Sequence, residues 1–230
     1  MARRKSHKDH FAELSVDSLH CPLCSSSKPQ PYWQDRKRPY LQCGECHLVF
    51  VPSSYHLSPE QEKSEYDLHQ NVSDDQGYRN FLSRALTPVV NRVTAPASGL
   101  DFGCGPGPVL AGMLSDAGYA MSVYDPYYAA NLDVLAQSYD FITCTEVIEH
   151  VAAPDQVFSK LVELVNPGGI IVMMTKRVIN RDAFGQWHYK NDPTHICFYS
   201  ESTFEWLAQH HQLDCEFESQ DVVVFRKDGE

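Results

Sequence analysis

Two pairs of cysteines in the first fifty residues have the spacing of a metal site. Cys21 and Cys24 form one CxxC pair, and Cys43 and Cys46 form a second pair eighteen residues later. Four thiolates arranged in this way can surround one tetrahedral Zn²⁺. A redox CxxC or two disulfides would use the same residues, but neither pair lies in a strand–helix–strand pattern and we expect a reducing compartment. The sequence therefore predicts a structural zinc site.

A glycine-rich turn provides a second candidate site. Residues 99–110 read GLDFGCGPGPVL, an apolar approach followed by closely spaced glycines. The turn lacks the GK[ST] of a P-loop, and Pro108 stands where the dinucleotide pattern needs a glycine. Glycines let the backbone approach a ligand closely, and Pro108 suits the first turn of a helix. Asp125 follows the next apolar segment, where an acid can accept ribose hydroxyls. These features predict a ligand with an adenosine-like sugar.

Alternating strands and helices are predicted to position this turn. Apolar segments bounded by turn residues indicate strands at 98–102, 120–124, 139–144, 169–174 and 213–225, the last as a broken pair. Helical periodicity indicates helices near 107–117, 154–165 and 201–210. This alternation predicts the α/β class, with a parallel sheet covered by helices.

Composition and charge set the wider limits. The chain has 230 residues, is 43% hydrophobic and carries a net charge of -11. Residues 1–50 hold eight Lys and Arg against five Asp and Glu, so the body that follows is strongly acidic and disfavours broad contact with nucleic-acid phosphates. Without a long apolar segment or a secretion-like start, we expect a cytoplasmic protein that does not enter membranes. The predicted parts are a basic tail (1–19), a zinc ribbon (20–52), a helical connector or substrate cap (53–97) and a cofactor-binding domain (98–230).

Four motifs in order resemble the class I S-adenosylmethionine-dependent methyltransferases. They are LDFGCGPG, Asp125 after the second strand, YDFITCTEVIEHV at the family's fourth strand, and LVNPGGIIVMM before its fifth strand. The resemblance covers roughly residues 97–230 and implies a Rossmann-like sheet with helices on both faces. The front, from CPLC to CGECHLVFVP, is similar to the zinc-binding leader of some enzymes of this kind, which act on sugars, polysaccharides or RNA.

The resemblance implies one set of residues around the cofactor: Asp101, Gly103, Cys104, Gly105, Asp125, Pro126, Tyr127 and Glu146. The four from the glycine turn would lie at its methionine part, with Cys104 as a small residue that fits there. Asp125 would hold the ribose, Pro126 and Tyr127 the adenine face, and Glu146 would close the pocket near the sulfonium. The family's third strand is shortened here, since only Asp133 is available as an acid between Asp125 and the next strand.

The segment 187–200, WHYKNDPTHICFYS, follows the strand after which this family places substrate contacts. Methyl transfer requires alignment of the acceptor and, for a weakly acidic acceptor, a base. We hypothesise that His195 is this base, oriented by Asp192 or another nearby carboxylate, because imidazole titrates near neutral pH. His150 is a second candidate. Alternatively, Asp192 forms a turn that His195 caps, or a metal binds at His188, Asp192 and His195.

The sequence thus predicts a methyltransferase that uses S-adenosylmethionine and carries a structural zinc. The acidic body favours a small or sugar-like acceptor. RNA methylation is an alternative because the ribbon holds aromatic and basic side chains that suit an exposed strand, namely Tyr32, Trp33, Arg36, Lys37, Arg38 and Tyr40. A non-catalytic zinc-ribbon interaction module is a further alternative, against which the intact glycine turn and Asp125 argue.

Overall fold

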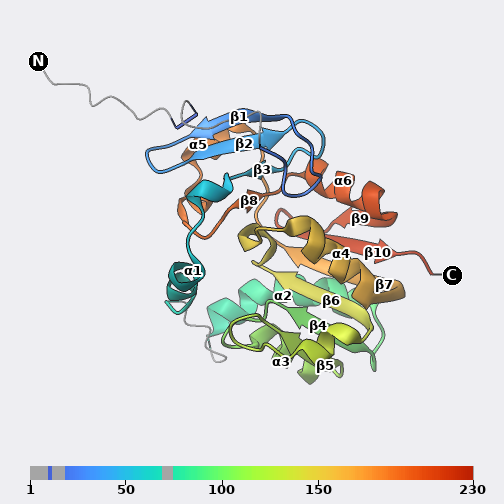
Figure 1. The fold of residues 1–230 in the computed structure, drawn as a ribbon. Helices are drawn as coiled ribbons and strands as arrows, with labels where there is room; N and C mark the ends of the chain where they lie inside the picture. Colours follow the sequence, from blue (N-terminus) through green and yellow to red (C-terminus); the bar gives the residue numbers. More distant parts are fainter. Residues whose placement is uncertain (1–9, 12–18, 69–74, 230) are drawn as a thin grey trace, which may run out of the picture.

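The computed structural model describes residues 10–11, 19–68 and 75–229 (Figure 1). Most of the predicted basic tail lies outside the described residues. The strands of the described residues form two sheets, one of six strands in the C-terminal part and one of four strands that contains the cysteine segment.

The six-stranded sheet has the order β5-β4-β6-β7-β10-β9. Its strands are β4 (Ser98–Phe102), β5 (Ala120–Tyr124), β6 (Tyr139–Thr145), β7 (Val165–Met174), β9 (Leu213–Phe217) and β10 (Val222–Lys227). β5, β4, β6 and β7 run parallel, and β10 is antiparallel to both of its neighbours. The predicted α/β class is confirmed, and β7 begins four residues earlier than the periodicity indicated.

Helices cover both faces of this sheet because its central strands are apolar on both sides. On β7, Ile170 and Val172 face one hydrophobic cluster, and Ile171 and Met173 face the other. The first cluster includes side chains of α2 (Gln76–Arg92) and α3 (Val109–Asp116), and the second includes side chains of α4 (Pro154–Leu164) and α6 (Glu201–His211). α2, part of the segment predicted as a connector, therefore forms one of the covering layers.

The chain between β5 and β6 is short. Within residues 125–138, all of which the structure describes, there is one 3₁₀ turn, η3 (Leu132–Ala136), and an isolated bridge from Asp125 to Ala129, but no strand. Asp133 is exposed on that turn. The shortened third strand of the sequence analysis is thus reduced to a loop.

The four-stranded sheet joins the cysteine segment to a distant part of the chain. β1 (Pro29–Gln34), β2 (Pro39–Cys43) and β3 (Val49–Phe50) continue into β8 (Cys197–Phe198), which lies beside β3 at the top of Figure 1. The short helices α5 (Arg181–Gln186) and η5 (His188–Asn191) precede β8. One continuous core cluster runs from these strands into the larger sheet, so the ribbon is packed onto the rest of the protein.

Two elements lead from the ribbon to the larger sheet. They are a 3₁₀ turn, η2 (Ser53–Tyr55), and a helix, α1 (Pro59–Tyr66), which starts with a capping box between Ser58 and Gln61. No helix in the described part of the chain combines the length and the apolar composition that a membrane crossing requires.

Candidate active site and zinc site

The four ribbon cysteines converge on one point. Cys21 Sγ lies 3.5 Å from Cys46 Sγ, Cys24 Sγ lies 3.4 Å from Cys43 Sγ, and all four sulfurs are within 4.8 Å of one another as free thiols. The contact with Cys46 lowers the pKa of Cys21 to about 6, whereas burial raises the pKa of Cys24 to about 12. Four cysteine sulfurs at these distances can surround one tetrahedral Zn²⁺, so the cluster fits a small zinc site.

We expect Cys43→Ser to remove the metal and loosen the ribbon, because the metal supplies folding free energy at such sites. The zinc content measured by elemental analysis should fall from about one zinc per chain to near zero, since a three-ligand site binds zinc far more weakly. The melting temperature should fall as well. Cys215→Ser, at a half-buried cysteine on β9, is the matched control and should keep the metal. Equal zinc in both variants would contradict this assignment.

A pocket of about 650 Å³ opens at the carboxyl ends of β4, β5 and β6. Because β4 is flanked by β5 on one side and β6 on the other, this is the point where strand order reverses and where α/β sheets bind ligands. Of the residues predicted to surround the cofactor, all but Asp101 line the pocket. The walls also include aromatic side chains of α1 and α2, Tyr66, Tyr78 and Phe81.

The glycine turn forms the floor of this pocket. Gly103 has φ +77°, and a Cβ at this position would lie 2.3 Å from Cγ2 of Val147, another pocket residue. Gly105 has φ +65°, and its N–H donates to Oδ2 of Asp125 at 3.0 Å. Both positions therefore need glycine. Asp101 lies beneath the turn, 4% exposed, where its Oδ1 accepts from the Thr143 hydroxyl at 2.8 Å and burial raises its pKa to about 6.

Backbone N–H groups fix the carboxylate of Asp125 at the pocket edge. Its Oδ1 accepts from Tyr127 N at 2.8 Å and Tyr128 N at 3.1 Å, and its Oδ2 accepts from Gly105 N. A carboxylate has about four acceptor positions, so Oδ2 keeps one for a ligand hydroxyl. Tyr127 is in turn tied to α1, since its hydroxyl donates to Glu62 Oε2 at 3.1 Å. No pattern in the sequence marks Glu62, because its contact with Tyr127 arises only from the way α1 packs against the residues after β5.

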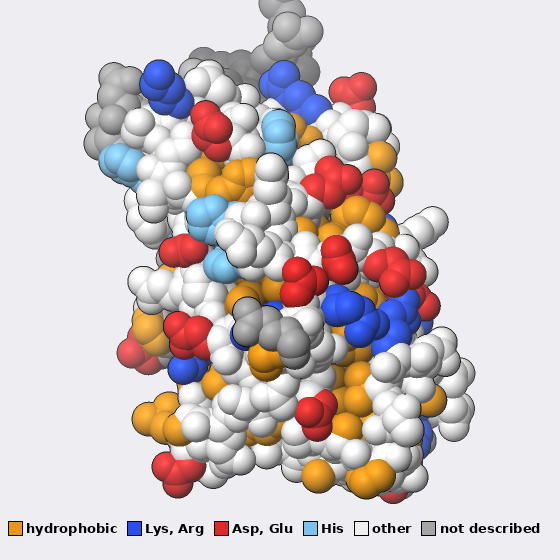
Figure 2. Space-filling view, turned by 90° about the vertical axis from the view of Figure 1, so that its right-hand side faces the viewer, with side chains coloured by type: hydrophobic (Ala, Val, Ile, Leu, Met, Phe, Trp, Pro, Cys, Tyr) orange, Lys and Arg blue, Asp and Glu red, His pale blue; other side chains and the backbone are white. Residues whose placement is uncertain are grey.

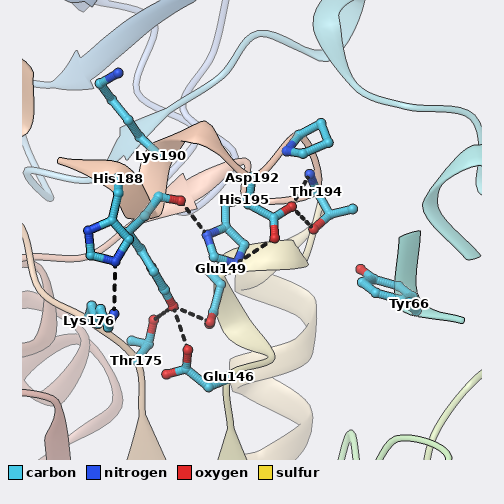
Figure 3. A network of polar contacts seen from close by, with 12 residues as sticks. Tyr66, Glu146, Glu149, Thr175, Lys176, His188, Lys190, Asp192, Thr194 and His195 are labelled. Carbon is cyan, nitrogen blue, oxygen red and sulfur yellow. Dashed lines mark hydrogen bonds and ion pairs between the residues drawn. The ribbon is translucent and has the colours of Figure 1, made fainter. Parts of the chain in front are cut away.

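His195 also lines the pocket and lies in the loop before β8 (Figure 3). Its Nδ1 is 2.8 Å from the carbonyl oxygen of Tyr189, and a carbonyl only accepts, so Nδ1 carries the proton. In the neutral ring, Nε2 then presents a lone pair, and burial lowers the pKa of His195 below its usual value. The ring centroid of His150 is 4.6 Å from that of His195.

Asp192 does not orient His195 in the predicted way. Its Oδ2 is 3.8 Å from Nε2, beyond hydrogen-bond distance, and its Oδ1 accepts from the Thr194 N–H at 2.9 Å and the Thr194 hydroxyl at 2.6 Å. The carboxylate thus stabilises the turn, and the Tyr189 carbonyl fixes the ring. The predicted metal group of His188, Asp192 and His195 is wrong as well, because the exposed His188 points to Lys176 Nζ at 3.5 Å (Figure 3).

The structure brings a different group together beside His195. Glu149, His150 and His195 each place one potential ligand atom within 4.8 Å of the others. Glu149 is fully buried, and burial raises its pKa to about 8. Its Oε1 is hydrogen-bonded to the Tyr189 hydroxyl, but Oε2 has no partner among the described residues. Glu146 has the left-handed φ of +51° and a pKa raised by burial to about 7. A buried carboxylate oxygen facing two imidazoles suits a divalent cation.

Comparison with known proteins identifies the family. A model of the methyltransferase domain matches residues 76–216, more than half of the chain. A ubiquinone biosynthesis O-methyltransferase of Pectobacterium atrosepticum is 34% identical over 98 residues, or 43% of this chain and 39% of the relative. A protein with the same name from Photorhabdus laumondii is 31% identical over 97 residues, or 42% and 39%. The matches thus span about two fifths of the length of these curated relatives.

A solved structure agrees in fold. The PH0226 protein from Pyrococcus horikoshii has a TM-score of 0.52 at 14% identity, covering 73% of this chain and 99% of that chain. At that identity the likeness concerns the fold alone, which is the arrangement described above. With the family model matching from α2 through β9, the chain belongs to the methyltransferase domain family.

Proposed function

We propose that this protein transfers the methyl group of S-adenosylmethionine to a hydroxyl of a small-molecule acceptor. The observation that carries this proposal is that His195, whose Nε2 keeps its lone pair because Nδ1 is hydrogen-bonded to a carbonyl, lines the same pocket as the glycine turn. Curated relatives named O-methyltransferases support a hydroxyl acceptor. The pocket volume of about 650 Å³ lies in the range of small-molecule sites.

The pocket fits the cofactor at three places. The close approach of the backbone at Gly103 and Gly105 suits its methionine part, and the free acceptor position of Asp125 suits its ribose. Pro126 and Tyr127 border the region for the adenine. Bound there, S-adenosylmethionine supplies an electrophilic methyl group on a sulfonium, which leaves as a neutral thioether.

In this proposal, His195 is the general base that accepts the proton of the acceptor hydroxyl. When the acceptor hydroxyl is methylated, its proton would move to Nε2 of His195. The Tyr189 carbonyl stabilises the resulting imidazolium through the N–H on Nδ1. The aromatic side chains of Tyr66 and Tyr78 give this pocket apolar walls, which would reduce the access of water to the reacting groups.

The unpartnered oxygen of Glu149 favours a second candidate for the same step. Glu149, His150 and His195 would hold a divalent cation, which supplies Lewis acidity to a hydroxyl. His195 Nε2 would then be a ligand instead of a base. The two candidates differ in what they require of Glu149, which has no part in the first one.

Glu149→Gln separates the two candidates. If a cation is used, we expect the variant to lose Mn²⁺ binding by electron paramagnetic resonance and to lose turnover by about 10²-fold, a typical cost of removing a buried charged ligand. The control is Glu163→Gln, an exposed glutamate on α4, which should behave like the unaltered protein. Full turnover of Glu149→Gln without added metal would leave His195 as the base. The zinc content of the ribbon is measured in parallel, because a chelator used to remove metal from this site would also remove zinc from the ribbon.

The RNA alternative has less support in this fold. Three of the six ribbon residues that it relied on are buried, Tyr32, Arg38 and Tyr40, so they cannot stack on an exposed strand. On the face drawn in Figure 2, acidic side chains are spread over the surface, and the main group of Lys and Arg side chains is bordered by acidic ones. Methylation of a small molecule remains the conclusion, and labelled RNA would overturn it.

A further inference from the structure

The hairpin between β1 and β2 carries a buried arginine that reaches into the catalytic part. Arg38 is only 6% exposed. Its Nη1 donates to the carbonyl of Pro193 at 3.0 Å, and its Nη2 donates to the carbonyls of Lys190 and Asp192 at 2.8 Å each. Its Nε donates to the Tyr40 hydroxyl at 3.1 Å. One guanidinium therefore binds three carbonyls of a four-residue stretch, more than 150 residues away in sequence.

The loop that Arg38 binds is the loop that holds His195. The carbonyl of Asp192 accepts from Arg38 and also from the backbone N–H of His195, at 3.3 Å. The carbonyl that fixes the His195 ring belongs to Tyr189, next to Lys190. Arg38 lies outside the pocket, so its contacts act on the position of the imidazole through the backbone.

The strand after the loop is held from the same side. Val51 N donates to the carbonyl of Ile196 at 2.8 Å, and β3 pairs with β8 from there on. Ile196 N in turn donates to the carbonyl of Glu149 at 2.8 Å. Ile196, adjacent to His195, thus connects the ribbon backbone to the turn that carries Glu149 and His150.

Three further sets of contacts join the hairpin to the segment that precedes β8. Phe184 packs edge-on against Tyr32 and Tyr40, at centroid distances of 5.3 Å and 5.1 Å. A Cβ at Gly185 would lie 2.6 Å from the Trp33 ring. Lys190, which is buried, forms an ion pair with Asp35 of the hairpin at 3.4 Å. Burying a guanidinium costs free energy unless all of its N–H donors are hydrogen-bonded. The hairpin is therefore stable in this position only when the loop carbonyls are in place, and the reverse also holds.

We propose that Arg38 is a positioning residue for methyl transfer and that the four-cysteine ribbon serves to hold the loop with His195 in its working geometry. The proposal rests on the proposed function of His195. The proposal makes the rate of methyl transfer depend on an intact ribbon, although neither the four ribbon cysteines nor Arg38 lines the pocket.

The test is Arg38→Met, which keeps the apolar stem and removes the donors, with Lys28→Met as control at an exposed ribbon lysine. We expect kcat to fall by about 10- to 100-fold, as misplacement of a catalytic group by about 1 Å does. The Kd for S-adenosylmethionine and the zinc content should stay unchanged. Amide hydrogen exchange should rise within residues 188–196. Arg38→Lys should recover only part of kcat, because one ammonium group cannot donate to all three loop carbonyls as the planar guanidinium does.

Several outcomes would overturn the proposal. They are unchanged exchange in residues 188–196 of Arg38→Met, kcat within about twofold of the unaltered protein, or a loss of cofactor affinity as large as the loss of kcat. If Arg38→Met does not fold, the same readings are taken on Arg38→Lys. Absent turnover in the unaltered protein would contradict the proposed function instead, and the exchange measurement would still decide whether Arg38 holds the loop.

Discussion

His195→Ala lowers kcat for methyl transfer by about 10²- to 10⁴-fold, the range that a positioned proton acceptor contributes. The Kd for S-adenosylmethionine stays within about twofold, because the hydrogen bonds that fix Asp125 come from Gly105, Tyr127 and Tyr128 and not from His195. The loss follows for either role of Nε2, as base or as metal ligand. Single-turnover kinetics with the identified acceptor, together with calorimetric titration of the cofactor, measures the two quantities separately.

His188→Ala is the matched control, since this histidine is exposed and lies outside the pocket. It should keep full turnover. If His195→Ala also kept full turnover, or if both variants lost it equally, His195 would have no direct part in the reaction.

Gly103→Ala abolishes cofactor binding at concentrations that saturate the unaltered protein. The left-handed φ of +77° strains any other residue, and the new Cβ would overlap Cγ2 of Val147 at 2.3 Å. Backbone strain and overpacking each cost about 1–3 kcal/mol, and relieving them displaces the turn or the Val147 side chain, both of which line the pocket. We expect Kd to rise by at least about 10²-fold, where each 1.4 kcal/mol is about tenfold.

Gly112→Ala provides the comparison for this variant. A Cβ at Gly112 meets nothing within 4 Å on α3, and alanine favours a helix more than glycine does. Cofactor affinity should be unchanged. Tight binding by Gly103→Ala, checked by calorimetry on folded protein, would mean that the turn is not the cofactor cradle.

The larger sheet could be predicted because its signal is local. Each central strand is a short apolar segment bounded by turn residues, and the alternation with helices leaves few possible topologies. The same holds for the cysteine pairs, whose spacing alone indicates a shared cation. The loop that replaces the third strand follows from counting residues between Asp125 and β6.

The pairing of β8 with β3 and the burial of Arg38 could not be predicted, because both depend on contacts between segments that are distant in the sequence. β8 has only two residues, Cys197 and Phe198, so it shows no periodicity, and its partner β3 is nearly 150 residues earlier. Arg38 sits in a polar QDRKR run that is typical of a solvated loop, and only the carbonyls of the distant loop bury it.

The surroundings of His195 were mispredicted for a related reason. A carboxylate three residues away suggested an acid partner, but the ring is fixed by a backbone carbonyl, which no side-chain pattern reveals. Glu149 was missed because the residue types in EVIEH do not show which way its side chains point. Residues 148–150 form a 3₁₀ turn, and the Glu149 carboxylate on this turn is fully buried.

The most direct test of the central claim is methyl transfer itself. The purified protein is incubated with S-adenosylmethionine carrying a labelled methyl group and with separated small-molecule, RNA and protein fractions of a cell extract, with Gly103→Ala run in parallel. Label that enters a small molecule through an ether linkage, and does so only with the unaltered protein, is the result expected here. Label confined to RNA or protein, or no transfer to any fraction by a protein that binds the cofactor, would contradict it.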